Sequence, residues 1–228
     1  MRRRAGRRLA LAVGAAVVAA TMIGAVFGAA GASPGEGAAA VAAVRASKSR
    51  QGPAAVAVPS SALQLVRAAR AQVGVTLGYD PSYVRLSYPG GDVDPSTGVC
   101  ADVIVRALRT LGVDLQQRIH VDMAANFRAY PTRWGLSRTD TNIDHRRVGN
   151  IATYFGRRGY GIAVTTNARD YLPGDIVVLK IPLDHIGIVS DRRQDGRPLL
   201  IHNVGGGAQE EDVLFAWTIV GHYRVLTG

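Results

Sequence analysis

The sequence predicts an α+β fold in which helices come first and an antiparallel sheet follows. Up to about residue 158, apolar residues recur at the helical spacing of three and four positions. Beyond residue 160 the apolar runs are short and rich in β-branched residues, and Pro, Gly and Asp separate them. Helices and strands that are segregated along one chain are typical of α+β domains rather than of alternating α/β folds.

Residues 1–32 have the composition of an export signal. Arginines crowd positions 2 to 8, an uncharged stretch begins at Leu9, and small residues at 30–32 form a cleavage pattern before Ser33. The alternative is a retained anchor, because about 20 apolar residues can span a bilayer. The small-residue pattern favours cleavage. We therefore expect an exported protein of the periplasm, cell envelope or medium, which contacts the membrane only through this segment if it stays uncleaved.

The net charge of +10 does not indicate a nucleic-acid-binding surface. Five of the charges are arginines within residues 1–8, and residues 33–60 contribute two more. This second segment is rich in Ala, Gly, Ser and Pro and predicts a flexible linker. Residues 61–228 carry only +3 and are long enough for one domain with its own core. No nucleic-acid partner is expected.

Four helices are predicted, at residues 61–73, 97–111, 121–130 and 144–158. The first has an apolar stripe and ends at Gly74. The second has its stripe at positions 99, 103, 107 and 111, with Thr97 as the expected N-cap and Gly112 as the stop.

A loop is predicted at residues 75–98, where Pro and Gly interrupt any periodic pattern. It contains Tyr79, Tyr83 and Tyr88. Aromatic side chains on such a loop either line a groove or pack the loop against the domain, and the sequence leaves both open.

Five strands are predicted, at residues 161–166, 175–181, 185–191, 199–204 and 220–226. Asp195-Gly196 is a strong hairpin signal, so the strands on either side of it are expected to pair. The glycines at 205–207 are expected to form a turn rather than a phosphate-binding loop, because no Lys-Ser or Lys-Thr pair follows.

Cys100 is the only cysteine of the chain, so it cannot form an internal disulfide. In an exported domain such a residue is either buried filler or a working thiol. Its predicted place in the first turn of a helix favours the thiolate, because the helix N-terminus is positive. Gly98 would leave the approach to the sulfur open.

His185 and His202 fall on the two strands joined by the predicted hairpin. They can face each other, one as the base that activates the thiol and the other as the residue that orients its ring. Asn203, on the opposite strand face, is the alternative orienting residue. Each residue taken alone is most often structural. Their joint order, Cys then His then a polar residue, favours nucleophilic catalysis.

This order resembles the papain-like peptidases, and especially the NlpC-type cell-wall endopeptidases. The matching residues are Cys100 at a helix start, residues 185–188 as the His-x-Gly-Ile strand, and residues 201–202 as the Ile-His pair. Residues 173–177 resemble the Pro-Gly-Asp-Leu strand that precedes the base. The usual Asp-Cys-Ser-Gly motif is absent, since Val99 precedes the cysteine.

The stretch from about residue 79 to 224 resembles more closely a bacterial family known as a domain of unknown function and grouped with that clan. The runs 98–100, 142–147 and 201–203 carry this resemblance.

The resemblance implies amide hydrolysis through an acyl-enzyme, with peptide substrates from peptidoglycan and with no cofactor. It also implies an oxyanion donor, the backbone N–H of the cysteine, and in some relatives an upstream tyrosine, for which Tyr88 is the candidate. Two other classes stay open: a non-catalytic, envelope-bound binding module, and an acyltransferase or lipid-acting relative. The oligomeric state is not predicted.

Other polar clusters receive structural interpretations. In residues 144–147, Asp144 is expected to cap a helix that carries a solvated basic pair, with no metal, although the arginines could contact an acidic substrate. Residues 120–122 are expected to start a helix. Asp102 is expected to pair with an arginine, and His222 to pack near the groove without a catalytic role.

Overall fold

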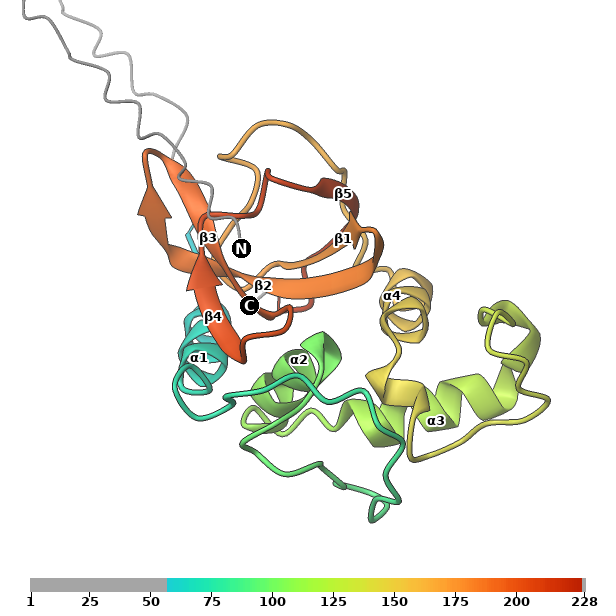
Figure 1. Cartoon of the computed structure of the whole chain (residues 1–228). Coiled ribbons are helices and arrows are strands. Elements are labelled where there is room, and N and C mark those ends of the chain that lie inside the picture. The colour runs from blue at the N-terminus through green and yellow to red at the C-terminus, as the bar shows by residue number, and fades with distance from the viewer. Residues whose placement is uncertain (1–56, 227–228) are drawn as a thin grey trace, which may run out of the picture. The chain divides into compact units, whose positions relative to one another are not determined.

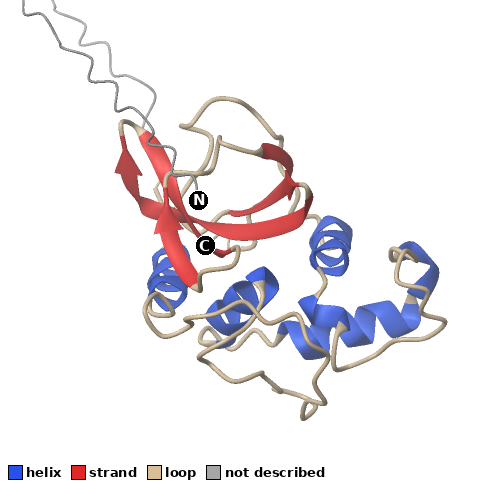
Figure 2. Ribbon diagram, viewed as in Figure 1, coloured by secondary structure: helices blue, strands red, loops and turns tan. Residues whose placement is uncertain are grey.

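The computed structural model describes residues 57–226, and the predicted export signal and nearly all of the linker lie outside them. The helices are α1 (Ser60–Arg70), α2 (Cys100–Arg109), α3 (Leu115–Ala125) and α4 (Val148–Arg157). The strands are β1 (Ile176–Ile181), β2 (Leu183–Gln194), β3 (Arg197–Asn203), β4 (Ala208–Glu211) and β5 (Thr218–Tyr223). The predicted α+β class, with helices before an antiparallel sheet, is confirmed (Figures 1 and 2).

The strands form one antiparallel sheet in the order β4-β3-β2-β1-β5. The long strand β2 lies at its centre, between β1 and β3. The hairpin between β2 and β3 turns at Asp195 and Gly196, whose φ angles are 49° and 80°. Two positive φ values are what a tight hairpin turn needs, and Asp-Gly tolerates them. The prediction of this hairpin is confirmed.

The sheet separates two apolar cores. On one face, α1, α2 and α4 pack against the sheet, as Figures 1 and 2 show, and the strands contribute Ile186, Ile188 and Ile201 to this core. On the far face, Leu179 and Leu200 pack with residues from the loops that precede β1 and β5. Neighbouring strand residues therefore point into different cores.

Three predicted boundaries are wrong. Residues 161–166 form no regular strand and make only a bridge from Gly161 to Tyr223. Helix α3 begins at Leu115, where Asp114 accepts a hydrogen bond from the N–H of Gln116, so residues 120–122 lie inside the helix rather than at its start. The segment 144–158 is broken because Arg147 has an extended backbone, which leaves a short 3₁₀ turn before α4.

Strand β4 is absent from the prediction. Its sequence, Ala-Gln-Glu-Glu, is polar and has little intrinsic preference for a strand. It forms because it pairs with β3 and because the N–H of Ala208 donates to the carbonyl of Thr76. Among residues 57–226, no helix combines the length and apolar character needed to cross a bilayer.

Candidate active site

Cys100 is the first residue of α2, as the sequence predicts. The N-cap is Val99 rather than the predicted Thr97, and the N–H of Val99 donates to Asp102 Oδ2 at 2.7 Å. Asp102, at the third helical position, thus caps the N-terminus of α2. Gly98 has a φ of 153°, and a Cβ there would lie 2.9 Å from Asp102 Oδ2. This position therefore requires glycine.

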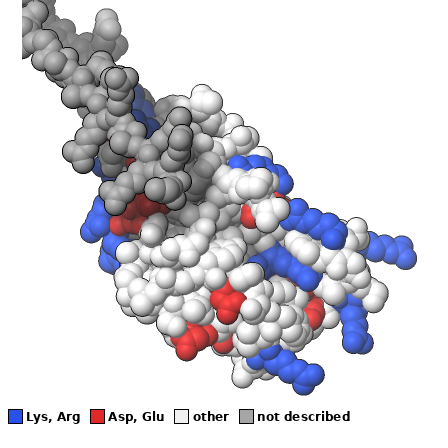
Figure 3. Space-filling model, viewed as in Figure 1, with Lys and Arg blue, Asp and Glu red and all other residues white. Residues whose placement is uncertain are grey.

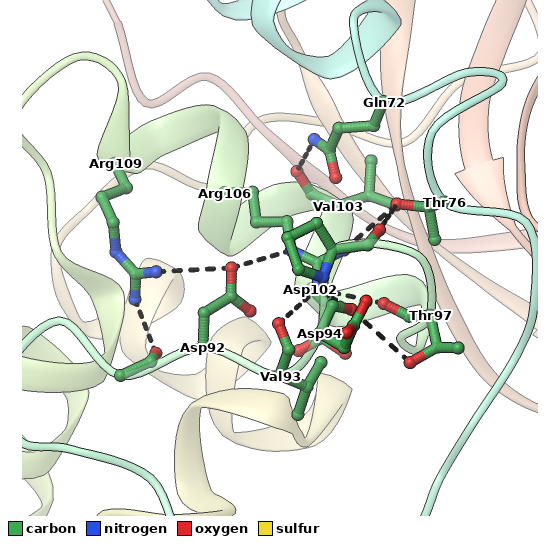
Figure 4. Close-up of polar contacts among 12 residues, drawn as sticks. Gln72, Thr76, Asp92, Val93, Asp94, Thr97, Asp102, Val103, Arg106 and Arg109 are labelled. Carbon is green, nitrogen blue, oxygen red and sulfur yellow. Dashed lines mark hydrogen bonds and ion pairs between the residues drawn. The ribbon is translucent and has the colours of Figure 1, made fainter.

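The loop before Cys100 is held by Arg106, which lies six residues further along α2. Figure 4 shows this guanidinium reaching back to the loop. It donates to the carbonyls of Val93, Asp94 and Thr97 at 3.0–3.2 Å, and it pairs with Asp92 at 2.9 Å. Because several carbonyls share one cation, the chain that leads into the cysteine has a fixed path.

The opposite side of the helix start is fixed by a buried ion pair. Arg146 donates from Nε and Nη2 to the two carboxylate oxygens of Asp102, both at 3.0 Å. Both side chains are almost fully buried. The expected pairing of Asp102 with an arginine is confirmed. The expectation of a solvated basic pair at 146–147 is wrong, because the fold turns Arg146 inward and leaves the Arg147 side chain only 16% exposed.

Cys100 is 4% exposed, and its sulfur has polar neighbours. The backbone N–H groups of Ile186 and Ala101 and the hydroxyl of Tyr79 lie near the sulfur and act to lower the pKa of the thiol. Burial nevertheless raises the pKa of the Cys100 thiol to about 11, because it outweighs these donors. The expectation that the helix start keeps the thiol ionised is therefore not met in this state of the protein.

A cavity of about 570 Å³ adjoins the sulfur. It is lined by Tyr79, Pro81, Tyr83, Val99, Cys100, Arg133, Trp134, Ile143, Arg146, Arg147, Val148, Leu183 and Asp184. Two of the three loop tyrosines therefore line a groove. The third, Tyr88, packs edge-on against His120, with ring centroids 5.1 Å apart, and is not part of this lining.

Tyr79, rather than the predicted Tyr88, is the tyrosine at the sulfur. Burial, followed by the neighbouring Cys100, raises the pKa of Tyr79 to about 12, so its hydroxyl keeps its proton and can donate. Nothing in the spacing of the loop distinguishes Tyr79 from Tyr88. The choice depends on how the loop folds over α2.

His185 and His202 contact each other directly. Nε2 of His185 lies 3.0 Å from Nδ1 of His202, with the rings perpendicular and both residues buried. Trp217 packs edge-on against both rings, at centroid distances of 5.9 and 5.6 Å. Burial, and then the second imidazole, lowers the pKa of His185 to about 3. No local sequence pattern predicts a role for Trp217.

The pair continues onto the next strand. His202 Nε2 lies 3.3 Å from a carboxylate oxygen of Glu211, which is within ion-pair distance but without the geometry of a hydrogen bond. Burial lowers the pKa of His202, while Glu211 opposes this shift. The sequence prediction lacks Glu211 because it lacks β4. A polar run after three glycines carries no signal that it pairs with the histidine strand.

Cys100 and the histidine pair approach β2 from different sides. His185 is in register with Leu179 and so shares the far face of the sheet, whereas Ile186 belongs to the core that contains Cys100. The sulfur meets the strand at the backbone of Ile186, one residue after His185. The structure brings the two imidazoles together and places the sulfur beside their strand, but in this state it does not join the sulfur to either ring.

Asn203 lies on the α2 side of the sheet. Its amide donates to the carbonyls of Gly78 and Gly98, both at 3.1 Å, and its oxygen accepts from the N–H of Gly205 at 3.2 Å. The residue therefore ties β3 to the chain just before Cys100. Of the two proposed orienting residues, His202 is the one in contact with His185.

The chain belongs to the family described as "Domain of unknown function (DUF1287)", whose model matches residues 66–225. The predicted membership of a family of unknown function is confirmed. "Uncharacterized protein YijF" of Escherichia coli (strain K12) is 56% identical over 165 residues, which cover 71% of this chain and 80% of that protein.

Two solved structures are similar, NlpC1 and NlpC2 from Trichomonas vaginalis. They are 14% and 18% identical to this chain, with TM-scores of 0.41 and 0.38. The matches cover 76% and 78% of this chain but only 47% and 51% of the matched chains. This chain therefore spans about half the length of each of those two proteins.

Proposed function

We propose that this domain is a cysteine hydrolase that cleaves an amide bond through an acyl-enzyme. The observation that carries the proposal is the position of one thiol at the start of a helix and at the wall of a cavity, with two backbone N–H groups and the hydroxyl of Tyr79 near the sulfur. Such a group of donors suits the charge that develops during acyl transfer. The histidine pair on the adjacent strand supports the assignment of a base.

The pKa values define the starting state. With the pKa of the Cys100 thiol near 11 and that of His185 near 3, both groups are neutral at pH 7. His185 then acts as a general base: it takes the thiol proton as the sulfur attacks the substrate carbonyl, and it returns this proton to the leaving amine. Water then cleaves the thioester. Catalysis requires the imidazole to reach the sulfur, a contact that commonly tightens only when substrate is bound.

Glu211 determines which nitrogen is basic. If its carboxylate accepts the Nε2 proton of His202, Nδ1 of His202 accepts in turn from Nε2–H of His185. The lone pair of His185 then lies on Nδ1. His202 and Glu211 are therefore positioning residues for the base.

We further propose that the substrate is the peptide part of peptidoglycan. Support comes from the resemblance to NlpC-type endopeptidases and from the predicted export. The cavity is also lined by Arg133 and Arg147, which suits an acidic peptide.

The test is turnover of peptidoglycan fragments. Muramidase-solubilised fragments are incubated with the protein, and products are followed by chromatography with mass spectrometry. We expect new amino termini from the wild type and none above background from Cys100→Ala, with Arg128→Gln as an exposed-surface control. Full activity of Cys100→Ala would contradict the proposal.

One observation favours a second candidate, a binding module of the cell envelope. A thiol this buried, with a raised pKa, also fits a cysteine without a chemical role. If wild type and Cys100→Ala bind the fragments equally and neither releases product, this candidate is correct. Transfer of the acyl group to added lipid amines instead of water would identify an acyltransferase.

A further inference from the structure

Part of the cavity wall is basic. It carries Arg133 and Arg147, which come from separate parts of the chain, a loop and the position just before α4. Lys and Arg side chains are most numerous over the side of the molecule where α3 and α4 lie (Figures 1 and 3). Helix α4 has no acidic residue in its first turn and no side-chain cap, so its N-terminus adds to the positive potential.

Both arginines are held against one indole ring. The guanidinium carbons of Arg133 and Arg147 lie 4.5 and 4.6 Å from the ring centroid of Trp134. Stacking fixes a guanidinium by its face, while its N–H groups lie in the plane and remain free to donate. A planar carboxylate can accept two such bonds at once.

The existing counter-ions leave Arg147 under-compensated. Arg146 is fully paired with Asp102, and Arg133 contacts Asp184. Arg147 Nη1 faces Oδ1 of Asp144 at 3.8 Å, and neither of these buried atoms has a hydrogen-bond partner among residues 57–226. Burial also raises the pKa of Asp144, so this carboxylate compensates Arg147 only weakly.

The packing around the indole leaves little room beside Gly149. A Cβ at Gly149 would lie 2.9 Å from Arg133 Nη2 and 3.2 Å from Trp134. Glycine in the first turn of α4 therefore lets the loop settle against the helix.

We propose that Arg133, Trp134 and Arg147 form a subsite that binds a free carboxylate of the peptide on which Cys100 acts. The inference rests on the proposed function, because it assigns the substrate to peptides with an unblocked carboxyl group. A monoanion fits better than a phosphate dianion, since Asp184 already lies in the same wall and repels additional negative charge.

The test measures binding without chemistry. Peptidoglycan fragments, and the same fragments after carboxyl amidation, are titrated into Cys100→Ala by calorimetry. We expect amidation and Arg147→Gln each to weaken binding at least about tenfold, because each removes charge-assisted hydrogen bonds. Arg147→Lys keeps the positive charge but loses the two parallel N–H donors of the guanidinium. Its affinity should lie between those of the parent protein and of Arg147→Gln. Arg133→Gln changes a more exposed side chain of the same subsite, so it tests the subsite even if the Arg147 variants misfold. It should also weaken binding of the free fragments.

The control is Arg128→Gln, which removes one exposed positive charge outside the cavity and should leave the dissociation constant unchanged. Equal binding of amidated and free fragments would overturn the subsite, even if wild type hydrolyses both. Competition by inorganic phosphate at concentrations as low as those of the peptide would overturn the assignment to carboxylate. Arginine-dependent binding without any turnover by wild type would uphold the subsite and contradict the hydrolase proposal.

Discussion

Two histidines buried in the same sheet have opposite surroundings. His222 on β5 uses both ring nitrogens: Nε2 lies 2.8 Å from Asp175 Oδ2, and Nδ1 lies 3.1 Å from the carbonyl of Ala163. Its ring stacks on Tyr171 at 4.3 Å. His185 on β2 uses Nε2 toward another imidazole, and Nδ1 takes no part in that contact.

The difference separates a structural histidine from a candidate base. A ring with both nitrogens in hydrogen bonds and a carboxylate partner is held in place but has no free lone pair. A ring that is oriented through one nitrogen keeps the other for proton transfer. The expectation that His222 has no catalytic role therefore has a physical reason.

The largest expected effect is the loss of catalytic rate when the proposed base, His185, is replaced. His185→Ala should lower kcat/KM on peptidoglycan fragments by about 10³-fold, because general-base catalysis is lost. His222→Ala should change the kcat/KM of the folded fraction by less than about threefold. Steady-state kinetics on both variants, corrected for folded protein, make the comparison. Equal losses in the two variants would remove the distinction between the histidines.

The next effect concerns stability on the β5 side. Asp175 accepts hydrogen bonds from Arg224 at 2.7 Å and lies 2.8 Å from His222, all within the interior or close to it. Asp175→Asn should reduce the free energy of unfolding by about 3 kcal/mol, because it removes the buried carboxylate that His222 and the partly buried Arg224 share. Urea unfolding measures this value. A change below the error of the measurement would show that the cluster does not support the fold.

The two regions should also differ in their pH dependence. Burial lowers the pKa of His185 to about 3. Below pH 6.5 the unfolded chain therefore binds a proton that the folded chain does not bind. The free energy of unfolding consequently falls as the pH decreases from 6.5 toward 3. Burial opposes ionisation of Asp175, but Arg224 and His222 lower its pKa below 3.8, so its stabilisation is present above that pH and is lost only in stronger acid.

Unfolding at a series of pH values separates these contributions. His185→Gln should flatten the stability curve between about pH 6.5 and 3. Asp175→Asn should flatten only its most acidic part. An unchanged curve for His185→Gln would mean that the imidazole is accessible to protons in the folded state.

The smallest effect is expected at Glu211, which is partly exposed. Glu211→Gln should lower kcat/KM by about threefold to fivefold, as for a solvent-screened ion pair. It should also shift the pH at which kcat/KM is half-maximal, because the imidazole pair loses its charged neighbour. Asp195→Asn, on the exposed hairpin, is the matched control. A loss of rate without any shift in the pH profile would indicate a merely structural role.

The local patterns were sufficient for much of this fold. Cys100 at a helix start, the hairpin at Asp195-Gly196 and the proximity of His185 to His202 all follow from short stretches of sequence, because capping, turn geometry and strand pairing act over a few residues. Tyr79 at the sulfur and Arg146 on Asp102 do not follow, since each joins segments far apart in the chain.

The sequence by itself therefore determined the α+β class, the family and the residue types available for thiol chemistry. Only the tertiary structure decided which tyrosine meets the sulfur, that β4 brings Glu211 to His202, and that burial rather than the helix dipole dominates the pKa of Cys100. The physical reason is that burial and long-range pairing depend on the packing of the whole domain, whereas helix starts and tight turns are fixed by their immediate neighbours.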